Sequence, residues 1–254
     1  MARVRLAHVG TATLLLEVAG VRILTDPALD PAGKLYRFRP GLSSTKTEEP
    51  RLPEGGLEPF ELVLLSHDHH ADNLDDAGRA LLPRAKHVLT TPPGARRLGG
   101  NAVGLVPFES FTHGKLRVTA VPARHGPPGI TLVDSETTGF VLEWEGQGRG
   151  ALYVSGDTVY FRGIEEIARR FKVGTAILHL GGVRFGLTGP LRYTFDARGA
   201  RRAAVTLGKP LVVPVHYEGW THFAEPRARF EESFAAEGLS VRWVPRGEWV
   251  TLED

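Results

Sequence analysis

Residues 62–73 read LVLLSHDHHADN, a short apolar run that leads directly into three histidines and two aspartates. Leu62 to Leu65 contains no polar residue and has the length of a strand, which is typical of a strand buried on both faces. The segment therefore predicts a buried strand whose end presents a dense cluster of polar side chains.

The cluster at residues 67–72 has the composition of a metal site. Imidazole and carboxylate groups together suit zinc, iron or manganese. The sequence contains no cysteine, which excludes disulfides, thiolate zinc sites and cysteine nucleophiles. Any metal ion in this chain must therefore be held by histidine and carboxylate side chains.

Three later residues repeat the arrangement of an apolar strand followed by a side chain that can bind a metal. His125, Asp157 and His216 each come shortly after such a run. Strand ends fix side chains more firmly than free loops do, and one edge of a sheet sandwich gathers such ends into a common site. We therefore expect these three residues to join the cluster.

The remaining pattern is mainly β at first and then mixed. Strands are predicted at residues 4–8, 13–18, 21–25, 62–65, 87–90, 115–121, 138–145, 151–155, 175–180 and 211–215. Helical patterns cover residues 74–82, 93–98 and 164–171. The stretch Thr194-Phe195-Asp196 can cap a further helix that runs to Leu207. Gly20 suits a tight hairpin. Residues 30–59 are rich in Pro, Gly, Ser and charge without a sustained period, which predicts a long surface loop.

The composition is that of an ordinary globular protein. Apolar residues make up 42% and charged residues 24% of 254, which we interpret as one compact domain over residues 1–254. The longest apolar runs have strand length, so no membrane span is expected. The chain opens on a strand pattern without a secretory signal, which favours a cytoplasmic location. The net charge is only +2, and the arginine pairs are interpreted as solvated helix faces, so nucleic acid is not the expected partner.

The order of an HxH-type cluster, an isolated histidine, Gly-Asp and a late histidine resembles the metallo-β-lactamase superfamily over nearly the whole chain. The stretches His8-Val9-Gly10-Thr11-Ala12-Thr13 and Leu24-Thr25-Asp26-Pro27 look like the branch of L-ascorbate-6-phosphate lactonases and N-acyl-phosphatidylethanolamine phospholipase D. The resemblance implies a four-layer αββα sandwich of the mixed α/β (α+β) class and a metal-dependent hydrolase.

The cluster departs from the family motif H-x-H-x-D-H by one extra residue. Read from the left, the motif pairs His67 with His69; read from the right, His70-Ala71-Asp72 matches H-x-D. Spacing does not choose between His69 and His70. Asn73 stands in the place of the motif's final histidine, and an amide oxygen is a poorer ligand for a borderline metal.

The resemblance implies one or two divalent ions, with zinc as the first candidate and manganese or iron as alternatives. The first ion would be held by His67, by His69 or His70, and by His125. The second would be held by Asp72 and His216, with Asp157 bridging the two. With Asn73 in the motif, the second site would be weak, differently populated, or completed by whichever of His69 and His70 the first site leaves free.

The implied chemistry is attack by a water that the ion activates at neutral pH. If it is not a full ligand, Asp72 is the candidate to orient this water and receive its proton. Tyr217 can donate to a developing oxyanion or serve in packing. Asp26 can support a ligand histidine or simply form a turn, and His179 can lie near a glycine-lined substrate path or be a buried, hydrogen-bonded histidine.

A smaller set of residues has weaker assignments. Trp220 and His222 are candidates for lining the pocket. Arg184 and Arg192 flank a glycine-rich segment and suit a phosphate or carboxylate, with a solvated loop as the alternative.

The sequence therefore predicts a hydrolase that cleaves an ester, lactone or phosphodiester in a small-molecule substrate, which can be anionic. Two alternatives remain: a nucleic-acid processing enzyme of the same fold, and a metal-binding or sensing module without turnover. An oligomeric assembly is compatible with the sequence.

Overall fold

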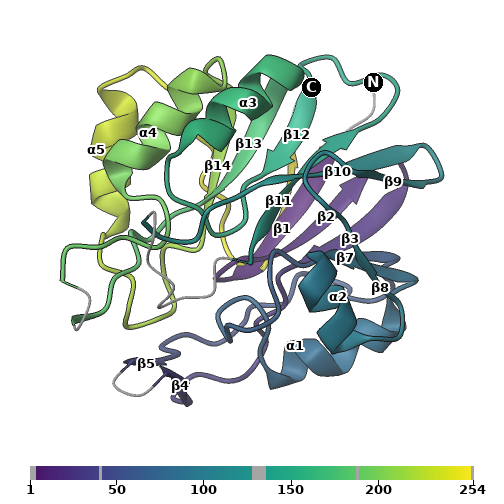
Figure 1. Cartoon of the computed structure of the whole chain (residues 1–254), viewed down its shortest axis with the longest axis horizontal. Coiled ribbons are helices and arrows are strands. Elements are labelled where there is room, and N and C mark those ends of the chain that lie inside the picture. The colour runs from purple at the N-terminus through teal and green to yellow at the C-terminus, as the bar shows by residue number, and fades with distance from the viewer. Residues whose placement is uncertain (1–3, 40–41, 128–135, 187–188, 253–254) are drawn as a thin grey trace.

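Two β-sheets face each other at the centre of the molecule, and helices cover their outer faces (Figure 1). The computed structural model describes residues 4–39, 42–127, 136–186 and 189–252. In this part of the chain, no helix is long and apolar enough to cross a membrane.

The first sheet has seven strands in the spatial order β15-β1-β2-β3-β6-β7-β8. Their bounds are β1 Val4–Gly10, β2 Thr13–Val18, β3 Val21–Thr25, β6 Leu62–Leu64, β7 His87–Thr90, β8 Ala102–Gly104 and β15 Trp249–Leu252. Ala19 and Gly20 form the turn between β2 and β3 with φ angles of 51° and 77°. Positive φ at both turn residues is what a two-residue hairpin requires, so the predicted hairpin is confirmed. From β3 to β8 the neighbouring strands are parallel.

The second sheet has six strands in the order β14-β13-β12-β11-β10-β9. Their bounds are β9 Ser110–His113, β10 Leu116–Pro122, β11 Thr138–Glu143, β12 Ala151–Val154, β13 Val173–His179 and β14 Leu211–Val215. β12, β13 and β14 are parallel, whereas β9 to β12 are antiparallel neighbours. β10 therefore runs in the same direction as β12, because both are antiparallel to β11.

Five α-helices and one 3₁₀ turn belong to the described residues. They are α1 Asp76–Leu81, η1 Leu82–Arg84, α2 Pro92–Leu98, α3 Arg162–Arg170, α4 Ala197–Thr206 and α5 Arg227–Ala235. The Asp196 carboxylate accepts a hydrogen bond from Gly199 N at 2.7 Å, which confirms the predicted cap of α4. Helices α3, α4 and α5 cover the second sheet, and α1 and α2 lie beside the first (Figure 1).

Three apolar clusters fill the spaces between these layers. One joins the facing sides of the two sheets, with Leu16 and Leu142 among its members. A second lies between the second sheet and its helices and includes Tyr153 and Phe230. The third packs the outer side of the first sheet against α1 and contains Val63. The order helix, sheet, sheet, helix confirms the predicted αββα sandwich.

The predicted long loop at residues 30–59 is wrong in part, because it contains the hairpin β4 Leu35–Arg39 and β5 Leu42–Thr45. Its base is fixed by tertiary hydrogen bonds, including Thr47 N to the carbonyl of Gly219 at 2.8 Å. The sequence pattern also misses β8, β9, α5 and β15. The three strands have only three or four residues each, and α5 buries only Phe230 and Phe234, so none leaves a clear period.

Candidate metal centre

The candidate ligands lie in segments that leave the carboxyl ends of strands. His67 follows β6, His125 follows β10, Asp157 follows β12, and His216 comes directly after β14. Because β10, β12 and β14 run in the same direction, the segments that follow them begin at one edge of their sheet. The structure thus gathers residues that are far apart in the sequence.

One group of ligand atoms combines His67, His70 and His125. Nδ1 of His70 lies 3.0 Å from Nε2 of His67 and 3.1 Å from Nε2 of His125. Nδ1 of His125 donates a hydrogen bond to the carbonyl of Tyr193 at 2.7 Å, so Nε2 of the neutral ring carries the lone pair. Burial lowers the pKa of all three imidazoles, which keeps the rings neutral and able to act as ligands.

His69 lies beside this group but not in it. Its ring centroid is 4.9 Å from that of His67 and 4.5 Å from that of His70. Its Nδ1 atom lies 3.9 Å from the carboxylate of Asp68. The geometry therefore joins His70, and not His69, to His67 and His125, where spacing alone left both open.

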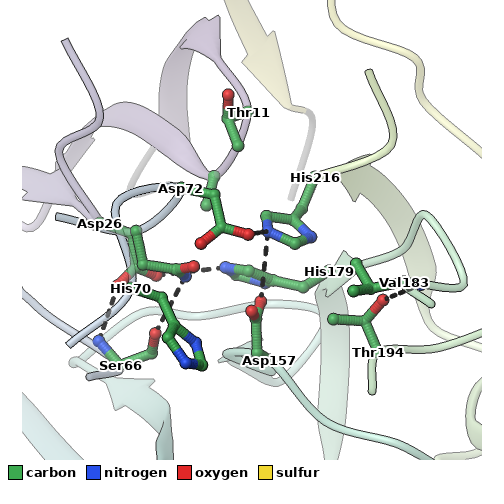
Figure 2. Close-up of polar contacts among 12 residues, drawn as sticks. Thr11, Asp26, Ser66, His70, Asp72, Asp157, His179, Val183, Thr194 and His216 are labelled. Carbon is green, nitrogen blue, oxygen red and sulfur yellow. Dashed lines mark hydrogen bonds and ion pairs between the residues drawn. The ribbon is translucent and has the colours of Figure 1, made fainter. Parts of the chain in front are cut away.

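A second group combines Asp72, Asp157 and His216 (Figure 2). Nε2 of His216 lies 3.3 Å from Asp72 Oδ2 and 3.6 Å from Asp157 Oδ1. The other oxygen of Asp157, Oδ2, lies 3.9 Å from Nε2 of His125 in the first group. Asp157 is therefore the residue between the two groups.

In the second group, charge interactions outweigh the effect of burial on the pKa values. Burial disfavours a charged His216, but the carboxylates of Asp157 and Asp72 raise its pKa to about 9. Burial likewise disfavours a charged Asp72, but His216 and His222 hold the pKa of this carboxyl well below its usual value. Asp72 is thus an ionised carboxylate at neutral pH.

Both groups fit a divalent cation. Within each group the ligand atoms all lie within 4.8 Å of one another, and they are imidazole nitrogens and carboxylate oxygens. Both oxygens of Asp157 and Oδ1 of Asp72 are buried, and the described residues offer them no hydrogen-bond donor. A buried carboxylate without donors is costly unless a cation neutralises it.

Asp26 supports the loop that carries the first group. Its Oδ1 atom accepts a hydrogen bond from Ser66 N at 2.7 Å, and Oδ2 accepts one from Nε2 of His179 at 3.2 Å (Figure 2). The hydroxyl of Ser66 lies 2.9 Å from Nδ1 of His67. Asp26 therefore supports the candidate ligand His67 through Ser66, and His179 is a buried, hydrogen-bonded histidine.

The backbone of His216 is held in an unusual conformation. Its φ angle is 58°, and its N–H donates to the carbonyl of Thr11 at 2.7 Å. A non-glycine residue in this region costs roughly 1–3 kcal/mol, so the surroundings must impose it. Trp220 reinforces the contact, because its Nε1 atom donates to Oγ1 of Thr11 at 3.1 Å.

Tyr217 and His222 lie in different surroundings. The ring of Tyr217 packs edge-on against Trp243, with centroids 4.9 Å apart, in the apolar cluster beneath the helices of the second sheet. The structure does not bring it into either ligand group. His222 instead contacts Asp72, and the only sequence signal was its position in the same loop as His216.

Arg184 and Arg192, the two candidates for anion binding, make hydrogen bonds within the protein. Arg192 donates to the carbonyl of Pro190 at 3.2 Å and lies 4.0 Å from the carboxylate of Glu225. The backbone N–H of Arg184 donates to the carbonyl of His222 at 3.3 Å. Their role toward a substrate stays a prediction.

Comparison with known proteins identifies the family. The beta-lactamase superfamily domain matches residues 21–217. The chain belongs to the metallo-β-lactamase superfamily. The match covers the strand ends from β6 to β14 and therefore both ligand groups.

Curated relatives of this superfamily member are named UPF0173 metal-dependent hydrolases. The protein of Methanoculleus marisnigri is 30% identical over 225 residues, which cover 83% of this chain and 90% of that protein. That of Methanosphaerula palustris is 27% identical over 251 residues, or 96% and 97% of the two chains. The chain therefore belongs to the UPF0173 metal-dependent hydrolase family.

A solved structure shows the same fold. A possible metal-dependent hydrolase from Veillonella parvula superposes with a TM-score of 0.84 at 19% identity, over 98% of this chain and 99% of that one. The match to the superfamily domain over residues 21–217 confirms the superfamily predicted from the motif. The resemblance to the lactonase and phospholipase D branch stays a prediction.

Proposed function

We propose that this metal-dependent hydrolase cleaves an ester, lactone or phosphodiester bond in a small-molecule substrate, with zinc as the first candidate ion and manganese or iron as alternatives. The observation that carries the proposal is the pair of ligand groups joined by Asp157, which lies between His125 and His216. Such a pair offers places for two ions side by side.

A divalent ion in these groups would lower the pKa of a coordinated water to about 7 and polarise a carbonyl or phosphoryl oxygen of the substrate. The protein's own residues supply orientation. Oδ1 of Asp72 is buried and has no donor among the described residues, so it can accept a hydrogen bond from that water. Because the pKa of Asp72 is held low, its carboxylate would orient the water but would be a weak base toward the water's proton.

Tyr217 is not part of this proposal, although its residue type suits an oxyanion donor. Its ring lies in the apolar cluster with Trp243, and burial raises its pKa to about 12. The phenol therefore stays protonated, and its ring belongs to the packing of the second sheet, so a role as oxyanion donor stays a prediction.

The test is metal analysis combined with turnover. Protein stripped with a chelator is reloaded with zinc, manganese or iron and assayed on p-nitrophenyl acetate, bis-p-nitrophenyl phosphate and a simple lactone. We expect turnover of at least one substrate that depends on the ion. H125A should lose both bound metal and activity, because it removes one of three ligands of the first group.

The matched control is H87A. His87 lies at the start of β7 and its ring packs against Phe111, 4.9 Å away between centroids, so this variant should keep metal and activity. Metal retained by the wild type with no turnover of any substrate, under all three ions, would contradict the enzyme proposal and favour a binding or sensing module. Turnover of an oligonucleotide alone would favour the nucleic-acid alternative.

A further inference from the structure

Asn73 is turned toward the first ligand group. Its amide nitrogen donates to the hydroxyl of Ser66 at 3.2 Å, and that hydroxyl lies 2.9 Å from Nδ1 of His67. Asn73 is fully buried. The residue that replaces the last histidine of the motif therefore helps to hold His67, and the second group lacks the imidazole that the motif would have supplied there.

Another imidazole reaches the second group from the far end of the chain. Nε2 of His222 lies 3.0 Å from Oδ2 of Asp72, the same oxygen that lies 3.3 Å from Nε2 of His216. A carboxylate oxygen accepts, so the His222 nitrogen carries the proton and donates it. This contact joins residues 150 positions apart in the sequence.

The ring of His222 is fixed by its neighbours. It packs against Phe185, Trp220 and Phe223, with centroid distances of 5.5, 5.7 and 4.7 Å. Its side chain is only 2% exposed. A ring packed in this way keeps one orientation and can fix the carboxylate that it contacts.

His222 touches one member of the second group, Asp72. Two ligands of one zinc ion lie about 2.0–2.2 Å from it and are therefore at most about 4.4 Å apart. The atoms of Asp72, Asp157 and His216 lie within 4.8 Å of one another, and the His222 nitrogen is not in this set although it touches Asp72. His222 therefore contacts the group through Asp72.

We propose that His222 is a positioning residue for the second ion: it donates a hydrogen bond to Asp72 and holds this carboxylate in the orientation that binds the ion. The proposal rests on the metal site of the proposed function. Because His222 follows His216 closely in the chain, binding of the second ion then depends on one segment for both a ligand and the hydrogen bond that holds Asp72.

The experiment compares H222Q and H222A by metal equivalents per chain and by affinity in chelator competition, with zinc as the probe. The Gln amide can donate a hydrogen bond but is a poor ligand for zinc. We expect H222A to lose the second equivalent, or to bind it 10- to 100-fold more weakly, while the first equivalent stays. H222Q should recover most of that loss. H87A is the matched histidine control, and circular dichroism confirms that each variant is folded.

Three outcomes would overturn the inference. H222Q as weak as H222A would make His222 a ligand, and H222A equal to wild type would remove any role. Loss of both ions in H222A with the fold intact would show that the contact does not act on the second group alone. None of these outcomes would overturn the proposed function, because that function is tested by metal binding and turnover in the wild-type protein.

Discussion

Asp68 and Arg97 form an ion pair that we expect to stabilise the folded chain. Asp68 lies inside the histidine cluster, and its side chain is 4% exposed, whereas that of Arg97 on α2 is 45% exposed. Arg97 donates from Nε at 2.9 Å and from NH2 at 2.6 Å. This fork holds the pKa of Asp68 well below its usual value, against the opposing effect of burial.

Replacing Arg97 with Met keeps the aliphatic stem and leaves the buried carboxylate without its counter-charge. Removing one partner of a fully buried pair costs about 3–5 kcal/mol, and an exposed pair contributes about 0–1 kcal/mol. Because water reaches Arg97 but scarcely reaches Asp68, we expect R97M to lower the free energy of unfolding by about 2 kcal/mol. In a chain of this size that is a fall in Tm of about 4–8 °C.

The assay is urea and thermal unfolding of chelator-treated protein, so that bound metal does not contribute. Arg96 is the matched control, because it lies on the same helix and no carboxylate of the described residues forms an ion pair with it. The double variant D68N/R97M should recover part of the loss, since it removes the unpaired charge. R97M within about 0.5 kcal/mol of wild type, or a double variant less stable than R97M, would refute the reasoning.

Three further predictions follow from single residues. A Cβ on Gly78 would lie 1.7 Å from the carbonyl oxygen of Pro27, so G78A should lower the free energy of unfolding by about 3 kcal/mol. G186A is the control, because a Cβ on Gly186 would meet open space. Equal stabilities of the two variants in urea would contradict this. D26N should weaken zinc binding by about 10- to 100-fold in chelator competition, because it alters the support of the His67 loop, and unchanged affinity would show that Asp26 only forms a turn. Burial lowers the pKa of His8 from 6.5 to about 4, so the unfolded chain takes up a proton in that interval that the folded chain does not. The stability of metal-free protein should therefore fall as pH falls from 6.5 toward 4, by about 1.4 kcal/mol per pH unit from this residue, and H8Q should reduce the slope by that amount; a slope equal to wild type would exclude His8.

Much of the candidate site was readable from local sequence. The apolar run that ends at Leu65, and those before His125, Asp157 and His216, set both the strands and the side chains at their ends. This works because strand period and burial are properties of a few consecutive residues. The same reasoning failed for the hairpin β4–β5, whose base is held by hydrogen bonds to a loop near residue 219.

Residues 62–73 by themselves determined the kind of site: a buried strand that delivers imidazoles and carboxylates, in an order that belongs to one superfamily. Only the tertiary structure decided which of those side chains face each other. It joined His70 to His125 in place of His69, turned Asn73 toward Ser66, and brought His222 to Asp72. The physical reason is that ring and carboxylate orientations are set by packing and hydrogen-bond partners that are distant in the sequence, and local spacing does not contain that information.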